Sequence, residues 1–270
     1  METAPQTAAQ QESMDFWNRW CSSYSNGVIE LHEITPDALA AYDRAYLQYY
    51  PYLLRRIRPE EMAGKRVLEV GLGFGTLGQR IAEAGAEYLG LDVAQNQVDL
   101  MNYRMEIHGL TGTARRMDFL RNDLPDASFD FVVSVGCFHH TGDIQRCVDE
   151  THRILVAGGS ARVMLYNRFS LRAWSRWPVR TARAMFGSTQ TANRRQRMSY
   201  DSFEGEAAPI TEFTSVREGR ERFQRFSSVA IRKENSAALK IHGIPLIPRK
   251  PLLHVVGPLL GLDLYIDAKK

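Results

Sequence analysis

The chain has 270 residues, of which 44% are hydrophobic, enough for one large α/β domain with an appended subdomain. Its net charge of +3 is too small to predict nucleic-acid binding, and its three cysteines lack the C-x-x-C pairing of disulfide frameworks and structural zinc sites. No apolar run reaches the roughly 18 residues of a membrane span, and the N-terminus lacks a signal-peptide pattern. We therefore expect a cytoplasmic protein without a metal or a nucleic-acid partner.

The first part of the chain is predicted to be a disordered start followed by helices. Residues 1–13 are mostly Ala, Gln, Thr and Glu without an apolar period, which predicts disorder. Residues 14–58 are rich in Trp and Tyr, and the Thr-Pro-Asp sequence at 35–37 is typical of a helix start, so we predict a helical cap with one helix through Tyr50. The aromatic side chains of this cap either pack on the sheet domain or form a lid over a ligand.

Residues 59–166 alternate between predicted strands and predicted helices. The strands are expected at 66–70, 88–91, 112–117, 129–135 and 160–166, and the helices at 76–84, 95–108 and 144–155. Regular β-α-β alternation with right-handed crossovers predicts an α/β fold with a doubly wound, mostly parallel sheet. Gly158 and Gly159 are expected at the turn from the last helix to the last of these strands.

Residues 167–210 form a basic segment that we predict to be a lid insertion. Between residues 167 and 199 there are eight arginines and no acidic residue. A helical period places five arginines on one side and apolar side chains on the other, with Pro178 kinking or dividing the helix. The five arginines are Arg168, Arg172, Arg176, Arg180 and Arg183, and the apolar side chains are Leu171, Trp174, Ala182 and Met185. The arginine face is either exposed to solvent, in weak contact with a membrane surface, or in contact with an anionic substrate.

Residues 211–270 are expected to complete the sheet. A predicted helix at 216–226 leads into a strand at 227–232, and the apolar and acidic alternation at 262–268 predicts a half-exposed strand. Such a pair closes the far edge of the sheet in antiparallel fashion. The apolar stretch at 252–260 is either core or an interface between subunits, so the oligomeric state is left open.

The stretch from Val67 to Gly75 carries the first chemical signal. Apolar residues of a buried strand lead into three glycines spaced two apart, Gly71, Gly73 and Gly75. This pattern is typical of a strand that turns sharply into a helix beside a nucleotide-type ligand, because a side chain would hold the ligand away from the backbone. A nicotinamide-binding domain more often shows Gly-x-Gly-x-x-Gly.

Acidic residues end the next two predicted strands. Asp92 ends the second strand, where a carboxylate can accept hydrogen bonds from ribose hydroxyls or simply cap the following helix. Asp118 ends the third strand, where it can accept a hydrogen bond from an adenine amino group, with Phe119 either beside the ring or in the core. Ligands of doubly wound sheets bind at the carboxyl ends of the strands, so both acids are candidates for one cofactor site.

Two adjacent histidines follow the fourth strand of the predicted sheet. An unperturbed imidazole is partly neutral near pH 7, so His139 or His140 could act as a general base. A structural role for the pair is an equal alternative.

Together these residues resemble the class I S-adenosylmethionine-dependent methyltransferases, in particular the small-molecule branch of type 11-like enzymes. The resemblance covers roughly residues 60 to 166 and rests on Glu69 ahead of the glycines, the two acidic strand ends, the Phe-His-His-Thr loop at 138–141 and the segment that ends in two glycines at 158–159. The branch often has Leu at position 138 and Lys-Pro before the two glycines, and this chain departs at both places.

The resemblance implies S-adenosyl-L-methionine as cofactor and a Rossmann-like seven-stranded sheet with one antiparallel strand near an edge. It implies that Glu69 and the glycines contact the methionine part, Asp92 the ribose, and Asp118 with Phe119 the adenine. The complete predicted cofactor site consists of Glu69, Gly71, Gly73, Gly75, Asp92, Val93, Asp118, Phe119 and Ser134.

The implied reaction is in-line methyl transfer to oxygen, nitrogen or carbon of a small hydrophobic or amphipathic metabolite. His139 and His140 are the predicted catalytic residues, and Tyr24, Tyr42 and Tyr166 are placed by location in the acceptor pocket. A catalytically inactive cofactor-binding or partner-binding protein of the same fold is the main alternative. Arsenite methylation and RNA methylation are disfavoured, because the cysteines do not pair and no RNA-binding module is present.

Overall fold

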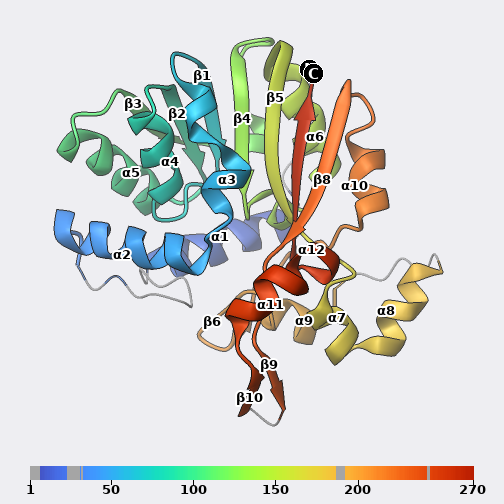
Figure 1. The fold of residues 1–270 in the computed structure, drawn as a ribbon. Helices are drawn as coiled ribbons and strands as arrows, with labels where there is room; N and C mark the ends of the chain where they lie inside the picture. Colours follow the sequence, from blue (N-terminus) through green and yellow to red (C-terminus); the bar gives the residue numbers. More distant parts are fainter. Residues whose placement is uncertain (1–6, 23–30, 32, 187–191, 242–243) are drawn as a thin grey trace.

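The computed structural model describes residues 7–22, 31, 33–186, 192–241 and 244–270, and Figure 1 shows one large sheet flanked by helices. The sheet has seven strands in the order β3-β2-β1-β4-β5-β11-β8. These strands are β1 (Arg66–Val70), β2 (Glu87–Asp92), β3 (Gly112–Arg116), β4 (Phe129–Val135), β5 (Leu155–Tyr166), β8 (Ser228–Glu234) and β11 (Asp263–Lys269). Strands β1 to β5 pair in parallel, and β11 runs antiparallel between β5 and β8, which confirms the predicted fold class.

Helices cover both faces of the sheet and its lower edge in Figure 1. The helices beside the sheet are α4 (Thr76–Glu83), α5 (Gln95–Ile107), α6 (Ile144–Ile154) and α10 (Val216–Arg222). Those at the lower edge, where the parallel strands end, include α1 (Ala8–Ser22), α2 (Pro36–Tyr49), α7 (Leu171–Arg176), α8 (Pro178–Met185), α9 (Arg194–Met198), α11 (Arg249–Val255) and α12 (Gly257–Leu260).

Short elements connect these parts. They are the helix α3 (Leu53–Ile57), the 3-10 turns η1 (Pro59–Met62), η2 (Phe119–Arg121) and η3 (Phe138–His140), and the strands β6 (Ser202–Phe203), β7 (Glu206–Ala207), β9 (Leu239–Ile241) and β10 (Ile244–Ile247). None of the helices in the described ranges is both long and apolar enough to cross a membrane.

The central strands are buried on both faces, as continuous apolar runs in parallel sheets require. Val67 and Val133 belong to the hydrophobic cluster that includes side chains of α4 and α5. Leu68 and Val132 belong to a second cluster, which includes side chains of α6 and Phe223 after α10. Neighbouring residues of β1 and β4 therefore point to opposite sides of the sheet, and the strand ends are held in fixed positions.

The prediction of disorder through residue 13 was wrong from Ala8 onward, where α1 begins. Ser13 donates a hydrogen bond to the carbonyl oxygen of His140 at 3.0 Å, and the amide of Gln10 donates one to the carbonyl oxygen of Thr141 at 3.3 Å. Phe16, one turn further on, is only 1% exposed. Long-range contacts stabilise this helix although its first residues lack an apolar period.

The predicted turn at Gly158 and Gly159 was also misplaced, because β5 begins at Leu155, directly after α6. Gly158 has a φ of +78°, and the pairing of β4 with β5 is irregular near this point. A Cβ on Gly159 would lie 3.0 Å from the carbonyl oxygen of Asp130 on the neighbouring strand. The two glycines thus permit an irregular start of a strand.

The basic insertion is divided at Pro178, as predicted, into α7 and α8. The predicted apolar face was wrong at Met185, which is 59% exposed. Arg168 lies before α7 and pairs with Glu218 at 2.8 Å, and Arg172 stacks on the ring of Tyr200 at 4.4 Å. These two arginines are therefore not part of a solvated face.

A buried ion pair joins the cap to the sheet domain. Arg104 of α5 is 0% exposed and donates hydrogen bonds to both carboxylate oxygens of Asp43 in α2, at 2.9 and 3.0 Å. Gln79 of α4 accepts a third hydrogen bond from the same guanidinium, and Asp43 also accepts one from the hydroxyl of Thr76. The network therefore fixes α2, α4 and α5 relative to one another.

We predict that Asp43→Ala lowers the free energy of unfolding by about 3–5 kcal/mol, because Arg104 would remain as an uncompensated buried charge. Urea denaturation measures this change. As control, Glu221→Ala breaks the exposed pair of Arg217 with Glu221 (88% and 58% exposed) and should cost less than about 1 kcal/mol. Equal costs for the two variants would contradict the structural role of the buried pair.

Candidate functional site

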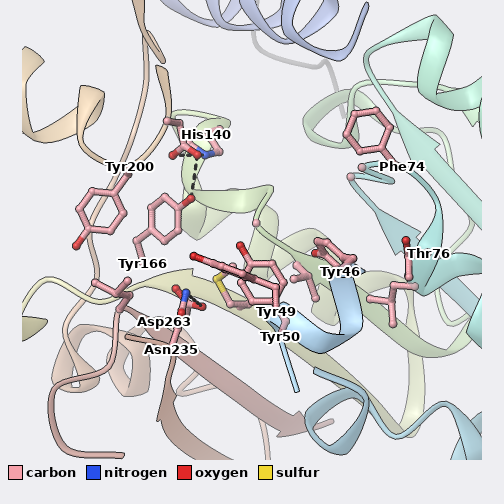
Figure 2. Close-up of a pocket in the computed structure, with 18 of the residues that line it drawn as sticks. Tyr46, Tyr49, Tyr50, Phe74, Thr76, His140, Tyr166, Tyr200, Asn235 and Asp263 are labelled. Carbon is pink, nitrogen blue, oxygen red and sulfur yellow. Dashed lines mark hydrogen bonds and ion pairs between the residues drawn. The ribbon is translucent and has the colours of Figure 1, made fainter. Parts of the chain in front are cut away.

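Two adjoining cavities lie at the carboxyl ends of the parallel strands. The larger cavity, drawn in Figure 2, has a volume of about 530 Å³, and the smaller one has a volume of about 200 Å³. Their shared wall consists of Trp17, Cys21, Gly71, Gly73, Val135, Gly136 and His140. Doubly wound sheets bind ligands at this edge, so the two cavities together are the candidate site.

The glycine turn forms part of the shared wall. Gly71 and Gly73 have φ values of +83° and +51°, which a side chain would strain. A Cβ on Gly71 would lie 2.5 Å from the Cβ of Cys137, whereas a Cβ on Gly73 would meet no atom within 4 Å. Gly73 therefore presents bare backbone beside open space, as a ligand that lies against the chain requires.

Gly75 lies where two helices approach each other. It is the N-cap of α4 with a φ of +79°, and a Cβ there would lie 2.8 Å from the Cδ of Arg104. Among the described residues, Gly75 is not part of the lining of either cavity. Its lack of a side chain allows α4 and α5 to approach each other.

The smaller cavity brings together six of the predicted cofactor residues: Gly71 and Gly73 of the shared wall, and Asp92, Val93, Asp118 and Phe119. Asp92 accepts backbone hydrogen bonds from Leu72 at 2.8 Å and Ala94 at 2.9 Å, which fix its carboxylate. Burial raises the pKa of Asp92. Each carboxylate oxygen can accept a further hydrogen bond, so the residue can still bind a ribose hydroxyl.

Asp118 and Phe119 form the far part of the smaller cavity. Asp118 accepts a hydrogen bond from the backbone of Leu120 at 3.0 Å and pairs with Arg121. The ring of Phe119 stacks on the ring of Phe138 with 5.5 Å between centroids. An aromatic wall beside a fixed carboxylate suits a purine ring with an amino group.

Helix α1 forms one wall of the smaller cavity. Its lining residues are Gln10, Ser13, Met14, Trp17 and Cys21. The aromatic-rich N-terminal segment therefore contributes to the site through Trp17, as the lid alternative predicts.

Glu69 lines the larger cavity and is 2% exposed. Burial raises its pKa to about 8, and repulsion from Asp92 contributes, while a hydrogen bond from the hydroxyl of Tyr88 opposes the shift. A cationic ligand in the cavity, such as an amino group, would stabilise the anionic form of this buried carboxyl group further.

Tyrosines and acids form the other end of the larger cavity. In Figure 2, Phe74 and Thr76 of the glycine turn lie at one end, and Tyr166, Tyr200 and Asp263 lie at the other. The tyrosines that line this cavity are Tyr42, Tyr46, Tyr49, Tyr50, Tyr166, Tyr200 and Tyr265. Tyr42 and Tyr166 therefore line the cavity in which the acceptor pocket was predicted, whereas Tyr24 lies outside the described residues.

Of the two predicted catalytic histidines, only His140 lines the cavities. Its Nδ1 donates a hydrogen bond to the carbonyl oxygen of Ile210 at 2.8 Å, and its Nε2 lies 3.5 Å from Oδ2 of Asp201. The hydroxyl of Tyr166 donates a hydrogen bond to Oδ1 of the same aspartate at 3.0 Å. Burial lowers the pKa of His140, although Asp201 opposes the shift, so the imidazole is neutral near pH 7.

His139 lies in the core behind this wall. It is 0% exposed, its ring packs against the ring of Tyr166 at 4.0 Å, and burial lowers its pKa well below the ordinary value. Ser134 is also buried, and its hydroxyl donates a hydrogen bond to the carbonyl oxygen of Val70 at 3.0 Å. Ser134 and His139 thus contact neighbouring strands in the core. Val135 and His140, which directly follow them in the chain, line the cavities.

The sequence reasoning did not single out Asp201, Asn235 and Asp263, which also line the larger cavity. The strand of Asp263 was expected to be half-exposed, yet this residue is 2% exposed. It pairs in register with Tyr166 at the end of β5. The acidic residue at the start of a strand was visible in the sequence, but its neighbour across the sheet was not.

Comparisons with known proteins agree with this geometry. Residues 67–159 match the family model described as a methyltransferase domain. An uncharacterized methyltransferase of Geobacillus thermodenitrificans is 27% identical over 151 residues, which cover 55% of this chain and 64% of the relative. A probable fatty acid methyltransferase of Pseudomonas putida is 36% identical over 102 residues, which cover 37% of this chain and 25% of the relative. The chain thus spans between a quarter and two thirds of the length of these relatives.

The fold is shared with solved structures. Magnesium protoporphyrin IX methyltransferase of Synechocystis, solved with bound S-adenosylhomocysteine, aligns with a TM-score of 0.55 and 11% identity over 97% of this chain and 99% of its own. At 11% identity, the similarity shows a shared fold and no more.

We predict that Gly73→Ala weakens the binding of S-adenosylhomocysteine at least about tenfold, because the added methyl group would enter the space beside the turn. Isothermal titration calorimetry measures the affinity. Gly64→Ala is the matched control, because Gly64 also has a positive φ (+67°) and open space around it but lines neither cavity. Both variants should lose about 1–2 kcal/mol of stability. An unchanged affinity of the Gly73 variant would contradict the placement of the ligand.

We also predict that Glu69 makes the free protein less stable as the pH rises from 5 to 8. Its pKa of about 8 in the folded state lies above its ordinary value of 4.5, so the folded state keeps a proton that the unfolded state releases. Glu69→Gln cannot titrate and should gain about 2–5 kcal/mol relative to the wild type across this range. Urea denaturation at several pH values tests this, and parallel curves would contradict it.

Proposed function

We propose that this chain, which carries a class I S-adenosylmethionine-dependent methyltransferase domain, transfers a methyl group from S-adenosyl-L-methionine to a small hydrophobic or amphipathic metabolite. The observation that carries the proposal is the pair of adjoining cavities. Most of the predicted cofactor residues line the smaller cavity or the shared wall, and Glu69 and seven tyrosines line the larger one. A cavity of about 530 Å³ is within the ordinary size range of small-molecule sites. The similarity to a probable fatty acid methyltransferase is consistent with an amphipathic acceptor.

The residues present fit the cofactor. The open backbone at Gly73 and the buried carboxyl group of Glu69 suit its methionine part, Asp92 suits the ribose, and Asp118 with Phe119 suits the adenine. When bound, S-adenosyl-L-methionine supplies an electrophilic methyl group on a sulfonium. The contribution of the protein is to hold the reactants and to exclude water, and α1 serves the second purpose.

Asp201 and His140 form the polar pair that we expect to hold a proton of the acceptor. Nδ1 of His140 donates its proton to the carbonyl oxygen of Ile210 in a hydrogen bond. The lone pair of the neutral ring therefore lies on Nε2, which faces the carboxylate of Asp201. Nε2 and Oδ2 lie 3.5 Å apart, and Oδ2 has no hydrogen-bond partner among the described residues, so a proton that leaves the acceptor can be held between these two atoms. Tyr166 stabilises the carboxylate from the other side.

A cytoplasmic location, the absence of a nucleic-acid partner and weak contact with a membrane surface stay predictions. The exposed side chains of α8, Val179 and Met185, lie among arginines, which is consistent with such a contact.

We predict that Asp92→Ala weakens S-adenosylmethionine binding at least about tenfold, because the hydrogen bonds to the ribose and the support of Leu72 are both lost. Calorimetry measures the affinity. Asp130→Ala is the control, since Asp130 pairs with Arg66 at the opposite ends of the strands. Equal affinity in the Asp92 variant and the wild type would refute the assigned site.

A radiolabelled methyl-transfer screen against a metabolite extract tests the reaction itself. Labelled small-molecule products are expected. Cofactor binding without any transfer would favour the alternative of a catalytically inactive cofactor-binding protein.

A further inference from the structure

The carboxyl group of Asp263 lies at the acceptor end of the larger cavity. Asp263 is the first residue of β11 and is 2% exposed. Because β11 runs antiparallel to its neighbours, its first residue lies at the edge where the parallel strands end, opposite Tyr166 of β5 and Glu234 of β8. In Figure 2 it is drawn beside Asn235 and below Tyr166.

No basic side chain of the described residues forms an ion pair with Asp263. The amide of Asn235 donates a hydrogen bond to its Oδ2 at 3.0 Å. The neighbouring Glu234, by contrast, is paired with both Arg55 and Arg56. Burial raises the pKa of Asp263 to about 7, against smaller opposing effects of Asn235, Arg172 and Arg249. A buried carboxylate without a counter-ion is costly, and a cationic ligand would remove that cost.

The two arginines whose charges oppose the raised pKa of Asp263 form their hydrogen bonds with other residues. Arg172 donates a hydrogen bond to the carbonyl oxygen of Ser199 at 2.6 Å and stacks on the ring of Tyr200. Arg249 donates a hydrogen bond to Asn235 at 2.8 Å and stacks on the ring of Tyr49 at 3.8 Å. The tyrosines of this cavity therefore already attract cations in the protein itself.

The walls around Asp263 favour a positive charge over a negative one. Tyr50, Tyr166 and Tyr265 line the same cavity, and aromatic faces attract alkylammonium groups. A second buried acid, Asp201, also lines it. An anionic acceptor would lie beside two carboxyl groups. Of the five arginines that suggested an anionic substrate, Arg172 alone is among the described residues that line the cavity.

We propose that the larger cavity binds the positively charged amino or alkylammonium group of its acceptor, with Asp263 as the counter-ion and tyrosine rings as the surrounding wall. The proposal rests on the proposed function and specifies its substrate class: a cationic amine with an apolar remainder. Asp263 acts here as a residue that determines specificity.

Three small probes of nearly equal shape test the charge preference. Choline carries a quaternary ammonium group, 3,3-dimethylbutan-1-ol replaces the charged nitrogen by carbon, and 3,3-dimethylbutanoate is an anion of similar size. Each is titrated into wild-type protein saturated with S-adenosylhomocysteine, and binding is followed by intrinsic fluorescence. We expect choline to bind at least about tenfold more tightly than the neutral alcohol, and the anion to bind more weakly than both.

Asp263→Asn keeps the shape of the side chain and removes its charge, so choline should then bind within about twofold of the neutral alcohol. Asp267→Asn is the matched control on the same strand, because Asp267 pairs with Arg58 and its side chain is 38% exposed. This control should keep the preference of the wild type for choline. The binding of S-adenosylhomocysteine to each variant verifies that the protein is folded.

Equal binding of choline and the alcohol to the wild type, or no binding of choline, would overturn the proposal without the use of any variant. An unchanged preference in Asp263→Asn would also overturn it. Failure of the wild type to bind S-adenosylhomocysteine would instead refute the proposed function, so the two failures are distinguishable.

Discussion

One buried ion pair, between Arg104 and Asp43, determines how the parts of the site meet. Its guanidinium lies in α5 against Gly75, and its carboxylate lies in α2 and also binds Thr76, where the glycine turn becomes a helix. The helix that supplies Asp43 also carries Tyr42 and Tyr46 into the larger cavity. A single network of hydrogen bonds therefore positions the glycine turn and part of the tyrosine wall of the larger cavity. Because the pair is fully enclosed, it tolerates little change in geometry.

The mixed direction of the strands explains why the site has two chemically different ends. The parallel strands β1 and β2 end in the glycine turn and Asp92, which line the smaller cavity and belong to the proposed cofactor site. The antiparallel β11 begins at the same edge, so its first residue, Asp263, lines the larger cavity. Both cavities thus lie at one edge of one sheet, and strands that run in opposite directions contribute to them.

Local patterns were sufficient to predict which acidic strand ends line the smaller cavity, but not the polar residues of the larger one. Asp92 and Asp118 follow apolar strands directly, so the sequence itself places them at the ligand edge. Asp201 contacts His140 across 61 positions of the chain, and α1 depends on the carbonyl oxygens of His140 and Thr141, so neither could be placed without the tertiary fold. Ser134 was predicted in the cofactor site, and its hydroxyl donates a hydrogen bond from β4 to β1, a contact that the local pattern does not reveal.

The wall common to both cavities has a thermodynamic consequence. Trp17 and His140 line each of them, and their rings lie 4.6 Å apart, so an occupant of either cavity restricts the same side chains. The second ligand then binds to a wall that is already ordered, so its binding costs less conformational entropy. The two affinities are therefore linked, and the linkage is reciprocal. If one ligand raises the affinity for the other by some factor, the other raises the affinity for the first by the same factor.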